Sequence, residues 1–284
     1  MGSPIGPTIR RRRLTKQLRE LREARGLSCE QVAQQLGYGA SWLSRIETNR
    51  RGVKPGDVRE LLHVYGVNGP EAEELVQLAR DARLRGWWQQ YDDILSDAIR
   101  TFVGLESDAT TIGNYEVSFI PGLLQTEAYA RELFRAWRPT VDGAETERKV
   151  SARMGRKQSI DRPNPPTLWA VIDEAVLRRE VGGPGVMREQ LLHLLEVGER
   201  PNINLQVIPF SVGAYDPMGS GFSVFEFAED DPPIVYIENL GGGVYLEDPK
   251  DVSRVLESLN YLRGAALSDR QSAELIAGIV KATQ

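Results

Sequence analysis

Apolar positions near the start of the chain recur at helical spacing. Leu14, Leu18 and Leu21, separated by four and three residues, predict one face of an amphipathic helix that ends near Gly26. The segment Ser28-Cys29-Glu30-Gln31 has the form of a capping box, in which a serine caps a helix and a glutamine follows three residues later. A second short helix is therefore expected directly after the first.

A third short helix is predicted over residues 40–48, after the glycine-containing turn at residues 37–39. Its inward residues are Leu43 and Ile46, and its outward or edge residues are Ser41, Trp42, Ser44, Arg45 and Thr48. Helices predicted over residues 56–65 and 70–83 follow. The sequence therefore predicts an all-α five-helix domain over residues 1–83.

The remainder, residues 86–284, has a mixed pattern. A linking helix is expected over residues 86–105, and the other predicted helices cover 121–137, 145–159, 173–180, 186–197, 251–263 and 269–281. Runs of β-branched or aromatic residues bounded by turn formers predict strands at 168–172, 204–208, 222–227 and 234–238. These elements predict a mixed α+β (α/β-like) C-terminal domain.

Composition narrows the class of protein. With 284 residues, 41% of them hydrophobic and 26% charged, the chain has the composition of a soluble globular protein of about two domains. No apolar run approaches the roughly 20 residues of a membrane span, and the basic run at residues 10–13 is followed by charged residues where an export signal has an apolar core. We therefore expect a cytoplasmic, nucleoid-associated protein without a membrane partner.

The chain offers little for metal or cofactor chemistry. Cys29 is the single cysteine, so the chain has no internal disulfide and no cysteine cluster for zinc. The two histidines, His63 and His193, make most metal and catalytic-triad chemistry improbable. We expect no metal site and no cofactor.

Charge divides the chain unevenly. Residues 1–60 hold 13 Lys and Arg against 6 Asp and Glu, whereas the remaining residues hold 22 against 34. A small basic segment thus precedes a larger acidic one. Such an asymmetry favours binding of a polyanion by the basic segment, because Lys and Arg that neutralise phosphates supply most of the non-specific affinity for nucleic acid.

The second and third predicted helices, joined by a tight turn, have the helix-turn-helix pattern, whose second helix enters the major groove of DNA. Arg45 is the first candidate for reading a base, since its guanidinium can donate two hydrogen bonds to guanine. The other candidates beside a base are Ala40, Ser41, Trp42 and Ser44. The candidates for phosphate contacts are Asn49, Arg50, Arg51 and Lys54 beyond the third helix, and Ser28 and Gln31 at the start of the second.

The stretch from Gln31 to Glu47, with Ser-Arg-Ile-Glu in the third helix and Asn49-Arg50 after it, resembles the Cro/repressor-type (XRE family) helix-turn-helix. In that family the positions that usually read bases correspond to Ala40, Ser41 and Arg45. The chain departs from the family by having Thr48-Asn49 where a glycine commonly follows the glutamate. The resemblance implies a DNA-binding domain.

The rest of the chain resembles the WhiJ-like group of actinobacterial regulators, whose C-terminal domain is mainly one of unknown function. The residues that carry the resemblance are Trp87-Trp88, Pro121 to Thr126, Tyr129 to Arg131, Arg153-Met154, Arg156, Gln158, Ile172 to Leu177, Gln206 to Pro209, Val235 to Glu238 and Ala265 to Ser268. The resemblance implies a regulator of development or secondary metabolism that often works with a small partner protein.

The sequence gives no support for an enzyme. Neither histidine lies in a His-x-Lys motif, and the chain has neither a phosphate-binding Gly-x-x-x-x-Gly-Lys loop nor a Gly-x-Ser-x-Gly elbow around Ser220. The acidic residues Asp173, Glu174 and Glu238 lie at the ends of predicted strands. They are expected to form a buried ion network with Arg153 and Arg156 rather than an acid and base pair, so no catalytic residue is predicted.

The leading hypothesis is a sequence-specific DNA-binding transcriptional regulator that acts as a homodimer on palindromic double-stranded DNA, while its C-terminal domain binds a small partner protein or effector. An alternative is an antitoxin-like protein that sequesters a small partner and autoregulates its own operon. A third hypothesis makes the C-terminal domain a hydrolase that uses Glu174 or Glu238.

Overall fold

The computed structural model describes residues 7–83, 86–137, 142–228, 231–239 and 242–282. The chain forms two compact units, Met1–Trp87 and Trp88–Gln284. No helix among these described residues is long and apolar enough to cross a membrane.

The first unit is built of helices. They are α1 (Pro7–Ala24), α2 (Cys29–Gln35), α3 (Trp42–Glu47), α4 (Pro55–Tyr65) and α5 (Pro70–Asp81). The predicted helical fold is thus confirmed. Helix α1 begins well before the predicted Leu14, because buried Ile9 extends the apolar face of the helix toward the N-terminus.

Residues predicted on the inner faces of the helices form the core of the first unit. Leu14, Leu18, Leu43 and Ile46 are buried in one cluster, together with Val58, Leu61 and Leu62 of α4. Residues that lie three or four positions apart share one face of a helix, so the short helices turn these faces toward a common centre.

The prediction that Trp42 lies outward or at the edge is wrong. Its side chain is 2% exposed, and its ring stacks on Tyr38 at 3.9 Å between centroids. Because α3 begins only at Trp42, the indole lies beside the preceding turn, where it packs with Tyr38. The Tyr38 hydroxyl contacts the Asp57 carboxylate on α4 at 3.4 Å. Trp42 therefore joins the turn to the core.

The second unit contains a six-stranded sheet with helices. Its strands are β1 (Thr111–Glu116), β2 (Thr167–Asp173), β3 (Ile203–Ile208), β4 (Phe222–Glu226), β5 (Ile234–Ile237) and β6 (Val244–Leu246). Its α-helices are α6 (Asp97–Asp108), α7 (Glu127–Trp137), α8 (Gly143–Gly155), α9 (Gln158–Asp161), α10 (Glu174–Arg178), α11 (Pro184–Val197), α12 (Pro249–Ala265) and α13 (Asp269–Ala282). The predicted mixed α and β architecture is confirmed.

The strand order is β3-β2-β1-β4-β5-β6. Strands β1, β2 and β3 run parallel. Strand β4 pairs antiparallel with β1, β5 pairs antiparallel with β4, and β6 pairs antiparallel with β5. The four predicted strands correspond to β2, β3, β4 and β5, whereas β1 and β6 were not predicted. After β1 the chain therefore adds β2 and β3 on one side of β1, and it then adds β4 on the other side of β1.

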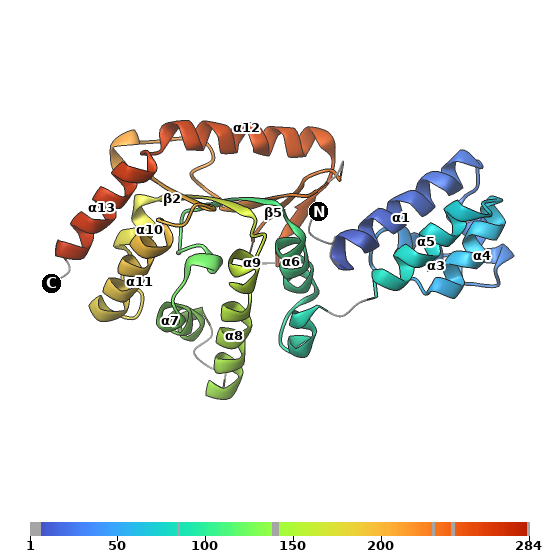
Figure 1. Ribbon diagram of the computed structural model, residues 1–284, viewed down its shortest axis with the longest axis horizontal. Coiled ribbons are helices and arrows are strands. Elements are labelled where there is room, and N and C mark those ends of the chain that lie inside the picture. Colours follow the sequence, from blue (N-terminus) through green and yellow to red (C-terminus); the bar gives the residue numbers. More distant parts are fainter. Residues whose placement is uncertain (1–6, 84–85, 138–141, 229–230, 240–241, 283–284) are drawn as a thin grey trace. The chain divides into compact units, whose positions relative to one another are not determined.

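Helix α12 covers one face of this sheet (Figure 1). Its Leu259 and Leu262 pack in a buried cluster with Tyr115 of β1, Val224 of β4 and Val235 of β5. Since side chains alternate between the two faces of a strand, the neighbours of these strand residues point to the opposite face. That face receives α6, where Phe102 packs edge-on against Phe225 at 5.1 Å.

The predicted helix over residues 86–105 is wrong as a single element. A 3-10 helix, η1 (Trp87–Tyr91), comes first, and α6 begins after Ser96. Ser96 interrupts the helical path because its hydroxyl accepts a hydrogen bond from the Ile99 backbone and caps the new helix. A 3-10 helix, η2 (Gly122–Leu124), likewise precedes α7, and η3 (Phe210–Val212) follows β3.

Candidate nucleic-acid interface

Helix α2 is fixed at its start by the predicted capping box. The Ser28 hydroxyl accepts from the Gln31 backbone N–H at 3.1 Å, and the Gln31 side chain accepts from the Ser28 N–H at 2.8 Å. Both side chains are exposed, and each one satisfies the backbone N–H of the other residue. Contact of this helix start with phosphate stays a prediction.

The outer surface of α3 carries small polar groups and one arginine. Ala40, Ser41, Ser44 and Arg45 are exposed, as predicted. Ser41 is the residue that precedes the first turn, and its side chain makes no capping hydrogen bond. Side chains this short leave room for the backbone of α3 to approach another surface closely.

Arg45 projects from this surface without a charged partner. Its Nε donates to the Ser41 carbonyl at 3.2 Å, and it makes no ion pair within the part of the chain that the structure describes. The backbone hydrogen bond anchors one edge of the guanidinium. Its two terminal nitrogens remain available for a bidentate contact.

The loop after α3 presents three further cations. Arg50, Arg51 and Lys54 are exposed, and their side chains form no ion pair with any residue that the structure describes. The Arg51 N–H donates to the Arg45 carbonyl at 2.8 Å, which connects the loop to the end of α3. Arg45 and this basic loop therefore lie on one continuous segment.

Asn49 is placed differently from its neighbours. It is half-buried in the left-handed backbone region (φ 57°), and its side-chain oxygen accepts from the Thr15 hydroxyl at 3.1 Å. Its backbone carbonyl accepts from Arg11 at 2.7 Å. These two oxygens hold the end of α3 against α1. Contact of the Asn49 side-chain Nδ2 with a phosphate stays a prediction.

A buried ion pair that the sequence pattern did not indicate supports α3 from behind. Arg22 of α1 donates through Nε and Nη2 to the two carboxylate oxygens of Glu47, at 2.7 and 2.9 Å. The side chains are only 10% and 6% exposed. The hydrogen bond to Glu47 raises the pKa of Arg22, so this guanidinium stays charged. An arginine and a glutamate four residues apart in one predicted helix would have indicated an ion pair. Arg22 and Glu47 are 25 residues apart, so no local pattern indicated that they pair.

The expected ion network of the second unit is partly wrong. Arg156 pairs with Glu106 of α6, which the sequence analysis missed, through contacts of 2.9 and 2.7 Å. Arg153 donates to the Gln125 side chain at 2.8 Å. Asp173 instead accepts from the Tyr215 hydroxyl at 2.5 Å, because the N-cap of α10 holds it at the end of β2.

Glu174 also lies outside the expected network. It pairs with Arg178 at 2.6 Å and accepts from the Phe210 N–H at 2.8 Å. No group of three or more His, Cys, Asp or Glu side chains suited to a metal ion occurs among the residues described.

The comparisons with known proteins divide the chain as its structure does. Residues 13–75 match a family model described as a helix-turn-helix domain. Residues 99–278 match a family model described as a domain of unknown function (DUF5753). The chain belongs to the DUF5753 family.

The helix-turn-helix match suggests DNA binding, and it suggests a regulator rather than an enzyme. The DUF5753 domain itself has no assigned activity. A search of curated proteins found no match.

Proposed function

We propose that this DUF5753 protein is a sequence-specific transcriptional regulator of the Cro/repressor type (XRE family), related to the WhiJ-like regulators of actinobacteria. Residues 1–83 form its DNA-binding domain and act on operator DNA at the nucleoid. Residues 86–284 form a regulatory domain that binds a small partner protein or effector.

The observation that carries this proposal is the exposed surface of α3. Arg45 is exposed, has no acidic partner among the described residues, and is flanked by Ser41 and Ser44. An arginine in this setting can donate to the O6 and N7 atoms of guanine in the major groove. The buried Arg22–Glu47 pair fixes the helix that carries it.

The basic loop supplies the contacts that fix the register. Arg50, Arg51 and Lys54 are exposed beside α3 and suit phosphates, as does the capped start of α2 at Ser28 and Gln31. Trp42 is left out of the proposed contacts because its side chain is buried in the protein core. Asn49 is kept among the phosphate contacts, since its side-chain Nδ2 can donate to a phosphate oxygen.

A palindromic operator and a homodimer follow from the size of this surface. Helix α3 has 6 residues, and so short a helix contacts too few base pairs for a useful specificity ratio. Two copies bound to half-sites one helical turn apart would roughly double the contact free energy.

The test is selection of bound duplexes from a random DNA pool by the full chain at a fixed salt concentration. We expect an enriched palindromic motif that the Arg45→Ala variant no longer selects. The matched control is Arg80→Ala on α5, which removes the same charge from an exposed arginine whose side chain donates to its neighbour Gln77 at 2.8 Å.

Enrichment of the same motif by Arg45→Ala would refute the assigned reading role. No enrichment by the unmodified chain would refute sequence-specific regulation and would favour the antitoxin-like alternative.

A further inference from the structure

A cavity of about 430 Å³ with polar and apolar lining lies in the second unit, on the face of the sheet opposite α12. Strand alternation brings Asn114 and Glu116 of β1, Ser223 of β4 and Tyr236 of β5 to its wall, together with Glu238 just after β5. Helices α6 and α8 close the other side with Glu106 and with Arg153 and Arg156.

The position of the cavity in the sheet is one where ligands commonly bind. The cavity lies at the carboxyl end of β1. Strand β2 pairs with one side of β1, and β4, which comes later in the chain, pairs with the other side. Open α/β sheets bind ligands outside the carboxyl ends of their strands, at the point where the strand order reverses. No metal or catalytic group is needed for this argument.

Asn114 carries an unsatisfied acceptor toward this space. The residue is 8% exposed, and its Nδ2 donates to the Ser223 hydroxyl at 3.0 Å and to the Phe222 carbonyl at 3.3 Å. Its Oδ1 is buried and has no hydrogen-bond partner among the residues that the structure describes. A buried acceptor without a donor costs free energy, so a ligand that donates a hydrogen bond here would be favoured.

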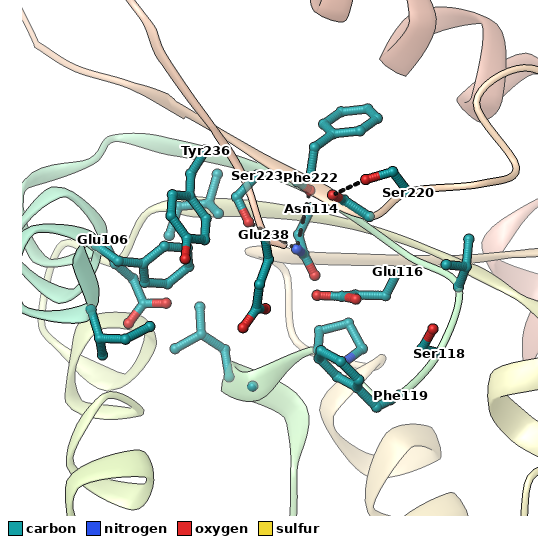
Figure 2. A pocket seen from close by; sticks show the side chains of 18 of the residues that line it. Glu106, Asn114, Glu116, Ser118, Phe119, Ser220, Phe222, Ser223, Tyr236 and Glu238 are labelled. Carbon is teal, nitrogen blue, oxygen red and sulfur yellow. Dashed lines mark hydrogen bonds between the residues drawn. The ribbon is translucent and has the colours of Figure 1, made fainter. Parts of the chain in front are cut away.

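Two carboxylates face the same space. Figure 2 shows the side chains of Glu116 and Glu238 pointing toward the region below Asn114. Neither carboxylate makes an ion pair within the described part of the chain. Burial and repulsion by Glu238 raise the pKa of Glu116 from its ordinary value of 4.5 to about 8. A cation between these groups would relieve the repulsion.

The arginines on the opposite wall do not cancel this charge. Arg156 is neutralised by Glu106, and Arg153 is the one guanidinium left to balance both Glu116 and Glu238 among the residues lining the cavity. Three carboxylates against two guanidiniums leave one negative charge in excess when all are ionised. In that state a ligand of charge +1 best neutralises the cavity, and below about pH 8 its binding is coupled to release of the Glu116 proton.

Aromatic side chains form the remaining wall. Phe119 and Trp137 both line the cavity and meet edge to face at 5.5 Å. Aromatic faces attract cations and also bury apolar groups. The volume falls within the range of pockets for small organic ligands.

We propose that this cavity binds a small organic amine with one positive charge and an apolar or aromatic body. The ammonium group donates to Asn114 Oδ1 and to the carboxylates of Glu116 and Glu238, and the apolar body lies against Phe119 and Trp137. Binding itself is independent of DNA, whereas the role of the amine as an effector rests on the proposed function.

The test is calorimetric titration of the full chain with 2-phenylethylamine. Two probes of similar shape serve as controls: 2-phenylethanol, which is neutral, and phenylacetate, which is anionic. We expect saturable binding of the amine and at least roughly tenfold weaker binding of both controls, because only the amine forms charge-assisted hydrogen bonds. No binding of the amine, or equal or tighter binding of either control, would overturn the proposal.

Variants locate the site. Glu116→Gln and Glu238→Gln, which keep the side-chain shape, are each expected to weaken amine binding roughly tenfold or more. Glu274→Gln on α13 is the matched control, because its carboxylate is 65% exposed and lies away from the cavity. Far-ultraviolet circular dichroism establishes that each variant is folded. Undiminished binding in both cavity variants would overturn the assignment.

The effector role has a separate readout. Saturating 2-phenylethylamine should change the affinity of the full chain for its selected operator, and the Glu238→Gln variant should lose this response. An operator affinity that the amine leaves unchanged would overturn the effector role. Amine binding without any selected DNA motif would instead refute the proposed function while the cavity site stands.

Discussion

Arg22 of α1 and Glu47 of α3 form a bidentate ion pair in the interior of the helix-turn-helix unit, with N–O distances of 2.7 and 2.9 Å. Glu47 follows Arg45 by two residues and also accepts from the Cys29 thiol at 3.4 Å, so one carboxylate joins α1, α2 and α3. The geometry of the proposed DNA-reading surface therefore depends on a pair that faces away from DNA.

Removing one member of this pair should destabilise the first unit. Glu47→Ala removes the bidentate partner of the buried Arg22 and leaves its charge with the longer contact of 3.3 Å to the exposed Glu23, and we expect a loss of up to about 3–5 kcal/mol. Amide hydrogen exchange of α2 and α3 measures the loss. Arg19→Ala, which breaks an exposed pair with Glu23, is the matched control and should change little. Equal exchange in Glu47→Ala and the unmodified chain would contradict the structural role.

Arg45 and Arg51 should differ in the kind of DNA affinity that they supply. Arg45→Ala is expected to cost about 1–3 kcal/mol on the selected operator and to relax preference at one base position. Arg51→Ala should weaken binding to operator and random DNA alike, and should lower the salt slope by about 1. Fluorescence anisotropy titrations over a series of salt concentrations measure both effects. Equal losses of Arg45→Ala on both DNAs would disprove its reading role.

Trp42 should act through folding. Trp42→Ala leaves a cavity in the core and is expected to lower the free energy of unfolding by about 3–5 kcal/mol. Trp42→Phe should cost much less, because the indole Nε1 has no hydrogen-bond partner among the described residues to lose. Urea unfolding of both variants, followed by operator binding, is the measurement. Loss of operator binding in a Trp42→Phe variant of normal stability would show a direct contact with DNA.

Glu116 should make the stability of the second unit depend on pH. Its pKa is raised by burial and by Glu238, against the opposing effects of the Asn114 hydrogen bond and of Arg153 and Arg156. Between about pH 4.5 and pH 8 the folded chain retains a proton that the unfolded chain has released. The stability that protonated Glu116 contributes is therefore present at low pH and is lost as the pH rises toward 8.

Glu116→Gln removes this titration. We compare the free energy of unfolding of the variant with that of the unmodified chain. We expect this difference to favour the variant more at pH 9 than at pH 5, by on the order of 1 kcal/mol or more. Thermal unfolding at the two pH values measures the difference, and Glu274→Gln should show no such trend. A Glu116→Gln effect of the same size at both pH values would rule out the titration of this carboxyl.

Local sequence signals were sufficient for much of the fold. The Ser28 and Gln31 capping box involves residues three positions apart, so the start of α2 was predictable from neighbours alone. Four strands were also predicted, because runs of β-branched or aromatic residues mark them. Strand β1 was missed because Gly113 and Asn114, residue types that strands disfavour, interrupt its apolar residues. Asn114 and Glu116 of this strand line the cavity of the second unit.

The sequence by itself determined the helices of the first unit, four strands of the second, the exposed arginine of α3 and the basic loop after it, since caps, periodicity and charge act over a few neighbouring residues. Only the tertiary structure decided that Trp42 is buried, that Arg22 meets Glu47 and that Glu116 faces Glu238. Each of these relationships either joins residues that are distant in the chain or depends on which face of a helix or strand becomes covered by another element. Their energies come from desolvation and close contact, which arise only when the elements pack together.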